Sequence, residues 1–317
     1  MLSSQTQPPS LLDRLRLKGV TGRRREEIDF YIGISPWVVG FLMFGGGPII
    51  ASFVLAFMDW KLIAAPHWVG LANYSQLLLS DKMFRTSLGN TLFYTVFSVP
   101  LGILAAMLIA MLVNQKVPGQ NIFRTIYYLP SVTSGVAVAL LWVWLLNPTF
   151  GLINFALGLV GIKGPGWLSD VHWAKPALVL MSLWGVGGGM VIFLAGLQGL
   201  PEHLYEAAKI DGAGPLRLFR HITLPMLTPT IFFMLVTSTI GSLQTFTNVY
   251  VMTNGGPGSA TLMYGLYLYQ NAFTFLKMGY ACALAWVLFA VVLALTYLQF
   301  RGASRWVYYE AELRPPR

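Results

Sequence analysis

The chain has 317 residues; 56% of them are hydrophobic, only 10% are charged, and the mean hydropathy is +0.63. Globular proteins carry roughly 25% charged residues, so this composition excludes an ordinary soluble domain and indicates a membrane protein. The formal net charge of +9 comes from basic residues spread along the chain without interleaved aromatic residues, which argues against nucleic-acid binding.

The N-terminal segment, residues 1–30, is predicted to be a cytoplasmic tail. It is basic, and its stretch LLDRLRL is compatible with an amphipathic surface helix. The apolar run that follows exceeds the roughly 7 to 15 residues of a signal-peptide core, so it is interpreted as a retained first span. Residues 31–85 are therefore predicted to hold the first transmembrane helix and an extracytoplasmic loop.

Windows without Asp, Glu, Lys or Arg divide the rest of the chain. A charge at the bilayer centre costs about 2.5 to 3.5 kcal/mol, and a spanning helix needs roughly 20 residues. The windows of sufficient length are 30–58, 86–115, 125–162, 176–201, 221–276 and 278–300. We predict an all-α membrane protein with six transmembrane helices: the first span, a five-helix core at 86–300 that includes a cytoplasmic loop at 199–224, and a cytoplasmic tail at 301–317.

Two windows are longer than one helix needs. The first breaks at Asn147-Pro148, and the LINFALGLV that follows is too short to span, which predicts a surface helix. The second breaks at the turn TNGGPG, residues 253–258, and the segment after it is predicted to be a surface or re-entrant element. A seventh span there would weaken the charge bias, whereas six spans with both termini cytoplasmic place 15 of the 21 Lys and Arg residues inside.

No catalytic or metal-binding pattern is evident. The phosphate-loop string G-x-x-x-x-G-K-[ST] is absent, and the four histidines lack metal-ligand spacing. They are His67, His172, His203 and His221. An embedded enzyme would need clustered carboxylates or a metal near the membrane surface, and a proton- or sodium-coupled carrier usually holds ionisable residues inside its spans. We therefore predict a non-enzyme that is driven from outside the chain.

The polar stretch EAAKIDGAGPLRLFRHITLPMLTP lies between two spans. A short helix is expected after Pro201 until Asp211-Gly212 stops it, and PLRLFRHI is expected to form a second. Three apolar residues of that second helix recur at three-residue spacing: Leu216, Phe219 and Ile222. The stretch is either an ordinary solvated loop or a knob whose apolar side lies in a partner's groove.

This stretch closely resembles the EAA signature of the integral membrane subunits of binding-protein-dependent ABC importers. The matching positions are Glu206, Ala207, Ala208, Asp211, Gly212, Ala213, Phe219, Ile222 and Pro225. Three further stretches resemble the carbohydrate-importing branch: WVGLANYSQLL at 68–78, FRTIYYLPSV at 123–132, and TNGGPG. The ending SRWVYYEAELRPPR resembles the first-type permease subunit of that branch.

The resemblance implies a type I ABC importer permease fold in a bacterial or archaeal cytoplasmic membrane, as a multi-pass protein in the lipid bilayer. The implied partners are a second homologous permease subunit, two ATPase subunits that dock the EAA loop, and an extracytoplasmic sugar-binding protein. ATP and Mg would be bound by the ATPase subunits, with no cofactor in this chain. Glu206 would anchor the loop, either to itself or to a partner, and Gly212 would permit its sharp turn.

A substrate path is predicted beside the fourth and fifth spans. Hydrogen-bonding residues recur every three or four positions in the fifth span: Ser238, Ser242, Thr245 and Asn248. The neighbouring Gln244 and Tyr250 are included, together with Phe246 as a surface for a sugar ring. Gly185 and Gly189 of the fourth span either permit close helix packing or leave room for the sugar.

The substrate is predicted to be a neutral sugar or small oligosaccharide, because a charged substrate would need a counter-charge and the charge-free windows offer none. A glycerol-phosphate-type or other polyol substrate is the alternative. An autonomous secondary carrier is a more distant one.

Overall fold

The computed structural model describes residues 22–115 and 118–308, which form two units divided between Val54 and Leu55. The predicted LLDRLRL helix lies outside the described residues. The first unit is an almost continuous helix made of α2 (Gly22–Phe41), the π-helical turn η1 (Leu42–Gly46) and α3 (Gly47–Leu55). Its residues 26–55 are long and apolar enough to cross a membrane. The helix begins inside the segment that the sequence assigned to the tail.

The second unit begins with a small antiparallel hairpin, in which β1 (Met58–Asp59) pairs with β2 (His67–Trp68). The helical elements that follow are α4 (Ala72–Ser75), η2 (Gln76–Ser80), α5 (Lys82–Val113), α6 (Gln120–Val132), α7 (Gly135–Leu145), α8 (Leu152–Leu159), α9 (Ala174–Ser182), η3 (Leu183–Gly185), α10 (Gly187–Gln198), α11 (Glu202–Ile210), α12 (Pro215–Leu218), η4 (Phe219–Thr223), α13 (Leu224–Met226), α14 (Thr228–Leu243), α15 (Thr247–Met252), α16 (Tyr264–Tyr269), η5 (Gln270–Thr274) and α17 (Met278–Ala303).

Six spans are present in the described residues when each bent helix pair is taken as one span. Three helices are long and apolar enough alone: residues 26–55, α5 and α17. The other three are bent pairs, with angles of 99° between α6 and α7, 49° between the segment from α9 to η3 and α10, and 60° between the segment from α12 to α13 and α14. The number of spans agrees with the six charge-free windows, whereas the bends were not predicted from the sequence.

Proline accounts for two of the bends. Pro130 lies in the last turn of α6, and Pro225 and Pro229 lie on the two sides of the bend before α14. Proline cannot donate a backbone hydrogen bond, and its ring clashes with the preceding turn, so a helix kinks or ends near it. The same property explains why these spans do not run straight.

The helices extend beyond the charge-free windows, which corrects one sequence-based expectation. Charged residues do occur inside the helices that form the spans, close to their ends, as Arg85 in α5, Arg124 in α6 and Lys175 in α9 show. Relative to the predicted boundaries at 30/31, 85/86 and 300/301, α2 begins nine residues earlier at Gly22, α5 begins four residues earlier at Lys82, and α17 ends three residues later at Ala303.

The two breaks in the long windows are confirmed. The Asn147 side chain accepts a hydrogen bond from the backbone N–H of Thr149 at 3.0 Å, which forms a turn after α7, and α8 is the short helix that follows. At 253–258 the chain turns through positive φ angles at Asn254, Gly255 and Gly258. The next segment, α16 and η5, is largely buried against α5 and α17, so it is folded into the unit rather than lying on its surface.

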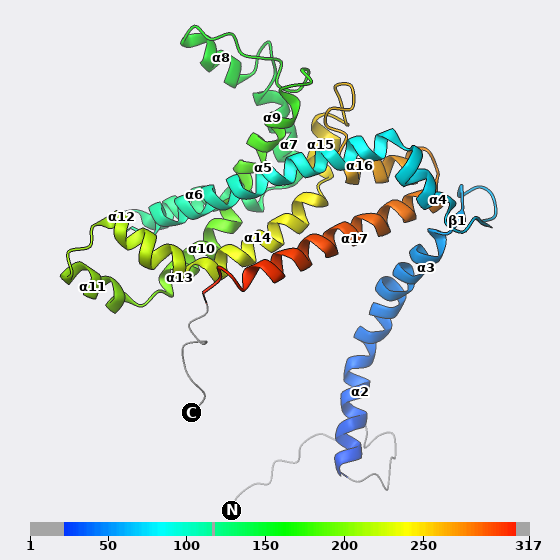
Figure 1. The fold of residues 1–317 in the computed structure, drawn as a ribbon, viewed down its shortest axis with the longest axis horizontal. Coiled ribbons are helices and arrows are strands. Elements are labelled where there is room, and N and C mark those ends of the chain that lie inside the picture. The colour runs from blue at the N-terminus through cyan, green and yellow to red at the C-terminus, as the bar shows by residue number, and fades with distance from the viewer. Residues whose placement is uncertain (1–21, 116–117, 309–317) are drawn as a thin grey trace, which may run out of the picture. The chain divides into compact units, whose positions relative to one another are not determined.

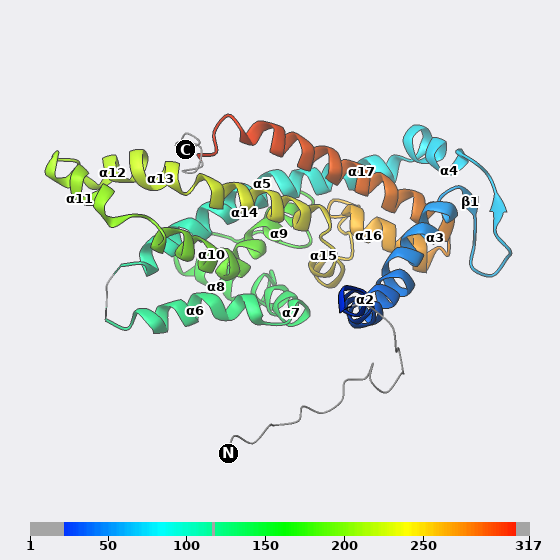
Figure 2. The same ribbon diagram turned by 90° about the horizontal axis from the view of Figure 1, so that it is seen from below.

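The second unit has its core around α5. One cluster joins α5 to α7, α9, α15, α16 and α17, with Tyr264 and Leu284 fully buried, and another joins α5 to α10 through residues such as Ala110 and Phe193. In both views α11 and α12 lie at one end of this unit, and β1 and α4 lie towards the other (Figures 1 and 2). The unit therefore carries its polar loop at one end of a bundle of apolar helices.

Candidate functional site

A hollow of about 350 Å³ lies beside α5 in the middle of the second unit. It is lined by residues of α5, α9, η3, α10, α14 and α15 and by the segment between α14 and α15. The lining residues are Tyr94, Ser98, Val99, Gly102, Ala106, Ser182, Gly185, Val186, Gly189, Met234, Ser238, Gly241, Ser242, Thr245 and Asn248. Most of them are hydroxyl-bearing or small, which leaves space surrounded by groups that can form hydrogen bonds.

The predicted stripe of the fifth span lines this hollow, although it does not lie on one helix. α14 ends at Leu243 and α15 begins at Thr247, so the expected continuous helix is interrupted between Ser242 and Asn248. Ser238 and Ser242 line the hollow from α14, Thr245 lines it from the interruption, and Asn248 lines it from α15. The four residues therefore line one hollow from three consecutive segments, which the periodicity of a single helix does not predict.

Two of the predicted path residues lie elsewhere. Gln244 is exposed and does not line the hollow. Tyr250 is 44% exposed and stacks on Phe246, with ring centroids 5.4 Å apart. Tyr269 contacts both rings, so Tyr250 belongs to an aromatic cluster next to the hollow.

The two glycines of the fourth span play different parts. A Cβ at Gly189 would lie 2.9 Å from Met234 Cε and 3.1 Å from Ala106 Cβ, which indicates close packing of α10 against α5 and α14. A Cβ at Gly185 would meet nothing within 4 Å. The sequence left two alternatives for these glycines, close helix packing or open space. The structure shows close packing at Gly189 and open space at Gly185.

The contribution of α5 and α9 was missed by the sequence analysis. Tyr94 and Ser98 line the hollow from α5 and Ser182 lines it from α9, and Ser242 Oγ of α14 lies 3.0 Å from Thr95 Oγ1 of α5. A signal was present in the sequence, because Asn90, Tyr94 and Ser98 recur every four residues in an apolar span and so lie on one helix face.

The loop with the EAA signature forms the polar end of the second unit. α11 ends in a Schellman motif: the N–H of Ala213 bonds the carbonyl of Ala208 at 2.9 Å, and that of Gly212 bonds the carbonyl of Lys209 at 3.0 Å. Gly212 has φ +78°, the left-handed conformation in which glycine avoids the Cβ penalty. Ala208, Gly212 and Ala213 of the signature are thus the residues that build the sharp turn.

The two limbs of this loop are held together from within. The Tyr205 hydroxyl lies 2.9 Å from Thr223 Oγ1, and Phe219 packs against the core between α5 and α10. The expected apolar stripe therefore divides: Phe219 faces its own core, whereas Leu216 is 78% exposed at the tip. Ile210, at the end of α11, is 87% exposed and was not expected there.

The remaining signature residues lie mainly on the outside of the loop. Ala207 and Asp211 are exposed, and Ile222 and Pro225 are partly buried at its base. Glu206 is exposed at the edge of an 820 Å³ hollow that Arg124, Lys209 and other polar residues also line. Within the described residues Glu206 has no hydrogen-bond or ion-pair partner.

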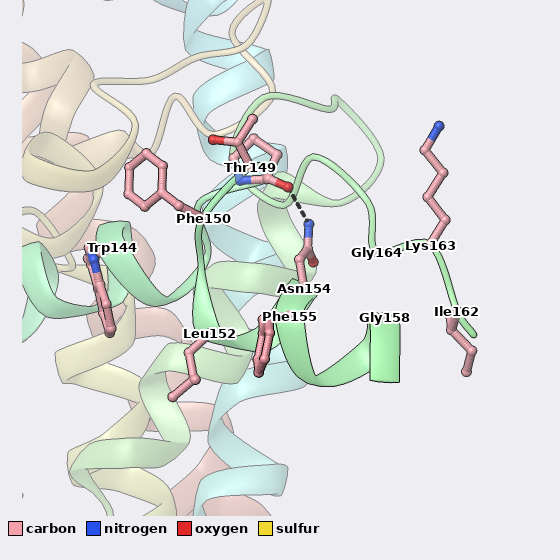
Figure 3. Close-up of a pocket in the computed structure, with 11 residues that line it drawn as sticks. Trp144, Thr149, Phe150, Leu152, Asn154, Phe155, Gly158, Ile162, Lys163 and Gly164 are labelled. Atoms are coloured by element: carbon pink, nitrogen blue, oxygen red, sulfur yellow. Dashed lines mark hydrogen bonds between the residues drawn. The ribbon is translucent and has the colours of Figure 1, made fainter. Parts of the chain in front are cut away.

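A third hollow, of about 380 Å³, lies against α8 and contains the exposed rings of Trp144, Phe150 and Phe155 (Figure 3). Asn154 supports this arm, because its Nδ2 donates to the carbonyls of Pro148 and Pro165, both at 3.1 Å, and its Oδ1 accepts from Trp167 at 2.7 Å. The α8 arm is thus an internally braced structure with aromatic side chains on its surface.

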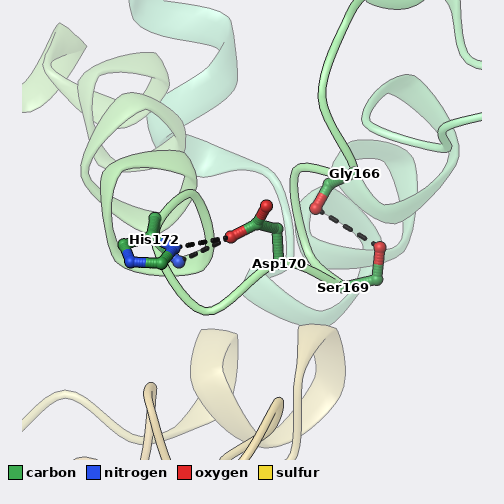
Figure 4. A network of polar contacts seen from close by, with 4 residues as sticks. All are labelled: Gly166, Ser169, Asp170 and His172. Carbon is green, nitrogen blue, oxygen red and sulfur yellow. Dashed lines mark hydrogen bonds and ion pairs between the residues drawn. The ribbon is translucent and has the colours of Figure 1, made fainter.

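The histidines do not converge on a metal site. His67 lies in β2, His203 in α11 and His221 in η4, and no group of three potential metal ligands occurs among the described residues. His172 instead contacts Asp170, whose carboxylate accepts its backbone N–H at 2.7 Å and lies 3.3 Å from its ring (Figure 4). These contacts lower the pKa of Asp170, principally through the backbone hydrogen bond from His172.

Comparison with known proteins identifies the family. The chain is 42% identical over 293 residues to the probable ABC transporter permease protein YesP of Bacillus subtilis (strain 168), covering 91% of this chain and 94% of YesP. It is 36% identical over 288 residues to the lactose transport system permease protein LacF of Rhizobium radiobacter, covering 89% and 96%.

A solved structure of a bacterial ABC transporter involved in the import of the acidic polysaccharide alginate contains a chain with a similar fold. The TM-score is 0.79 at 25% identity, and the match covers 89% of this chain and 96% of that one. Residues 98–305, which hold the EAA loop and all of the residues that line the central hollow except Tyr94, match the family described as "Binding-protein-dependent transport system inner membrane component". The chain belongs to this family of ABC transporter permeases, the multi-pass inner membrane subunits of binding-protein-dependent transport systems.

Proposed function

We propose that this chain is one of two permease subunits of an ATP-driven importer for a sugar or small oligosaccharide, and that the 350 Å³ hollow forms part of the path. The hydroxyls and the amide in its lining carry this proposal, since each hydrogen bond to a sugar hydroxyl contributes about 0.5 to 1.5 kcal/mol net. Such a site binds weakly, as transport requires. The lactose transport system of the relative LacF supports a saccharide substrate.

The energy is supplied outside this chain in our proposal. The sequence contains no phosphate-loop motif, so ATP and Mg would be bound and used by two ATPase subunits. The EAA loop would carry their motion to the bundle, because Phe219 fixes the loop to the core around α5 and α10, next to the residues that line the hollow. An extracytoplasmic binding protein would supply most of the substrate affinity.

The test uses the complete transporter reconstituted in proteoliposomes with its binding protein. Thr245→Ala combined with Asn248→Ala should reduce saccharide uptake at least fivefold, because two hydrogen bonds are lost, while binding-protein-stimulated ATP hydrolysis stays near the wild-type rate. Thr247→Ala is the matched control, since Thr247 is exposed in the same segment and does not line the hollow. Unchanged uptake in the double variant would remove the hollow from the path.

A further inference from the structure

Lys175 is a half-buried cation close to the hollow. The charge-free windows placed it just outside the fourth span, but the structure places it in the first turn of α9. Its Nζ lies 3.2 Å from Asn90 Oδ1 and 5.0 Å from the centre of the Phe93 ring. The bundle therefore does contain a positive charge between α5 and α9.

The neighbouring amide holds this ammonium in a defined direction. Asn90 Nδ2 donates to the carbonyls of Ser259 and Leu262, at 3.0 and 3.1 Å, which leaves its Oδ1 to face Lys175. An ammonium has three N–H donors, and Asn90 accepts one of them. Among the described residues no carboxylate forms an ion pair with Lys175, so its remaining donors are available to a ligand.

The position of Lys175 favours a negatively charged ligand. The ammonium is a positive charge with unused donors, and the first turn of α9 adds the positive end of the helix dipole. The Phe93 ring contacts the ammonium through its face but carries no negative charge. An anion bound beside Nζ would interact favourably with both the ammonium and the dipole, which makes an anionic ligand the best complement to this position.

Lys175 also lies in line with the hollow along two helices. On α5, Asn90 is one turn from Tyr94 and two turns from Ser98, and both of the latter line the hollow. On α9, Lys175 is seven residues from the lining residue Ser182, which corresponds to two turns, or roughly 10 Å along the same helix face. The direction from Ser182 to Lys175 leads away from α10 and the EAA loop, so Lys175 lies beyond the lining of the hollow, on the side away from that loop.

We propose that Lys175 is a specificity-determining residue that binds the carboxylate of an acidic saccharide where it enters the path. This inference rests on the proposed saccharide transport and narrows its substrate class, in place of the neutral sugar expected from the charge-free windows. The carboxylate accepts charge-assisted hydrogen bonds from Nζ while the hydroxyl-lined hollow receives the uncharged part of the sugar. Asn90 acts as a positioning residue that keeps the ammonium in place.

The experiment compares probes that differ only in charge. Trigalacturonate and trimannuronate, each beside its methyl ester, are offered to the complete transporter in proteoliposomes with its binding protein, and uptake by each variant is divided by wild-type uptake of the same probe. This ratio cancels any preference of the binding protein. Lys175→Met should reduce acid uptake about tenfold, the value of one charge-assisted hydrogen bond, and change ester uptake less than twofold.

Two further variants serve as controls. Lys175→Arg keeps the charge and should retain most acid uptake. Lys277→Met removes an exposed lysine at the start of α17 and should change neither probe.

Four outcomes would overturn the inference. Equal losses for acid and ester in Lys175→Met would mean that Lys175 serves assembly, for example by pairing with a carboxylate of the other permease subunit. Wild-type-like acid uptake in that variant would show that Lys175 does not contact the acid. If the wild-type transporter took up the esters but not the acids, the acidic substrate class would be refuted while saccharide transport would still hold. If it took up none of the four probes, the result would count against the proposed function as well.

Discussion

The carboxylate of Asp81 accepts a hydrogen bond from the hydroxyl of Tyr267 at 2.5 Å, although the two residues are 186 positions apart in the chain. Tyr280 donates to the same carboxylate oxygen, and the other oxygen accepts the backbone N–H of Phe84 at 3.0 Å as the N-cap of α5. One side chain thus caps the central helix and connects it to α16 and α17.

Removing this connection should lower stability without directly altering the hollow. Tyr267→Phe is expected to cost about 1 kcal/mol, and Asp81→Ala more, because the cap and both tyrosine hydroxyls lose their acceptor. Thermal unfolding of the purified protein in detergent measures the effect. Asp81→Asn keeps a side-chain acceptor for the cap, so its loss of stability should lie between those of Tyr267→Phe and Asp81→Ala. A ranking in which Asp81→Ala loses the least stability would contradict the assignment.

The carboxylate of Asp81 also predicts that the protein loses stability at low pH. Burial raises the pKa of Asp81, but the hydrogen bonds from Tyr267, Tyr280 and the backbone outweigh it and leave the pKa below the ordinary 3.8. Because the folded pKa is the lower one, its stabilising contribution is complete above about pH 3.8 and is lost as pH falls through the folded value. The unfolding temperature should therefore fall less steeply with acid in Asp81→Asn than in the wild type.

A close helix contact at Gly187 gives a second test of stability. A Cβ there would collide with the backbone carbonyl oxygen of Tyr127 in α6, whereas a Cβ at the adjacent Gly188 would meet nothing within 4 Å. Gly187→Ala should therefore destabilise by about 1 to 3 kcal/mol through overpacking, and Gly188→Ala should not destabilise. Thermal unfolding of the two variants, measured in parallel, tests this difference. Equal unfolding temperatures would show that α6 and α10 do not approach as described.

Open space at Gly185 predicts a block of transport without loss of folding. Gly185→Leu would place a branched side chain in the hollow, where a Cβ has no neighbour within 4 Å. We expect normal yield of the complex and a loss of saccharide uptake of tenfold or more, with the less bulky Gly185→Ala between it and the wild type. Full uptake in Gly185→Leu would mean that substrate does not pass this side of the hollow.

The EAA loop should couple the chain to the ATPase subunits. Glu206→Ala removes a carboxylate without a partner in the described part of the chain, and Gly212→Val forces a side chain into φ +78°, where L residues are strained. Both variants should insert into the membrane while co-purifying with less ATPase subunit or hydrolysing ATP without uptake.

Gly214→Ala is the control for this loop, because Gly214 has φ −75° and open space around it. Wild-type transport and complex yield in Glu206→Ala and Gly212→Val would refute the docking role.

Membrane orientation is open to a direct test. Reporter domains fused after Gly302 and within the EAA loop should read cytoplasmic, and one fused near Lys163 should read extracytoplasmic, since 15 of the 21 basic residues then lie inside. An extracytoplasmic signal after Gly302 would require an odd number of spans.

Features that depend on local composition and local backbone geometry could be predicted from the sequence. The number of spans followed from the charge-free windows, because the bilayer penalises charge at every position of a span irrespective of its neighbours. The turn at Gly212 followed from local backbone sterics, and its φ of +78° confirms that expectation. The EAA signature then led to the family, which the comparisons confirm.

The residues beside the hollow depend on how the helices pack, so they could not be predicted from the sequence. Thr95 and Ser242 are 147 residues apart and meet because α5 packs against α14, and no periodicity within one span reports a contact between two. Helical spacing predicted Ser238 and Asn248 in one helix, but that helix is interrupted between Leu243 and Thr247, and both residues still line the same cavity. The charge-free windows likewise predicted Lys175 to be a loop residue, because such a window ends at the first charged residue. A helix instead continues for as long as its backbone hydrogen bonds and neighbouring side chains stabilise it, so Lys175 lies within α9.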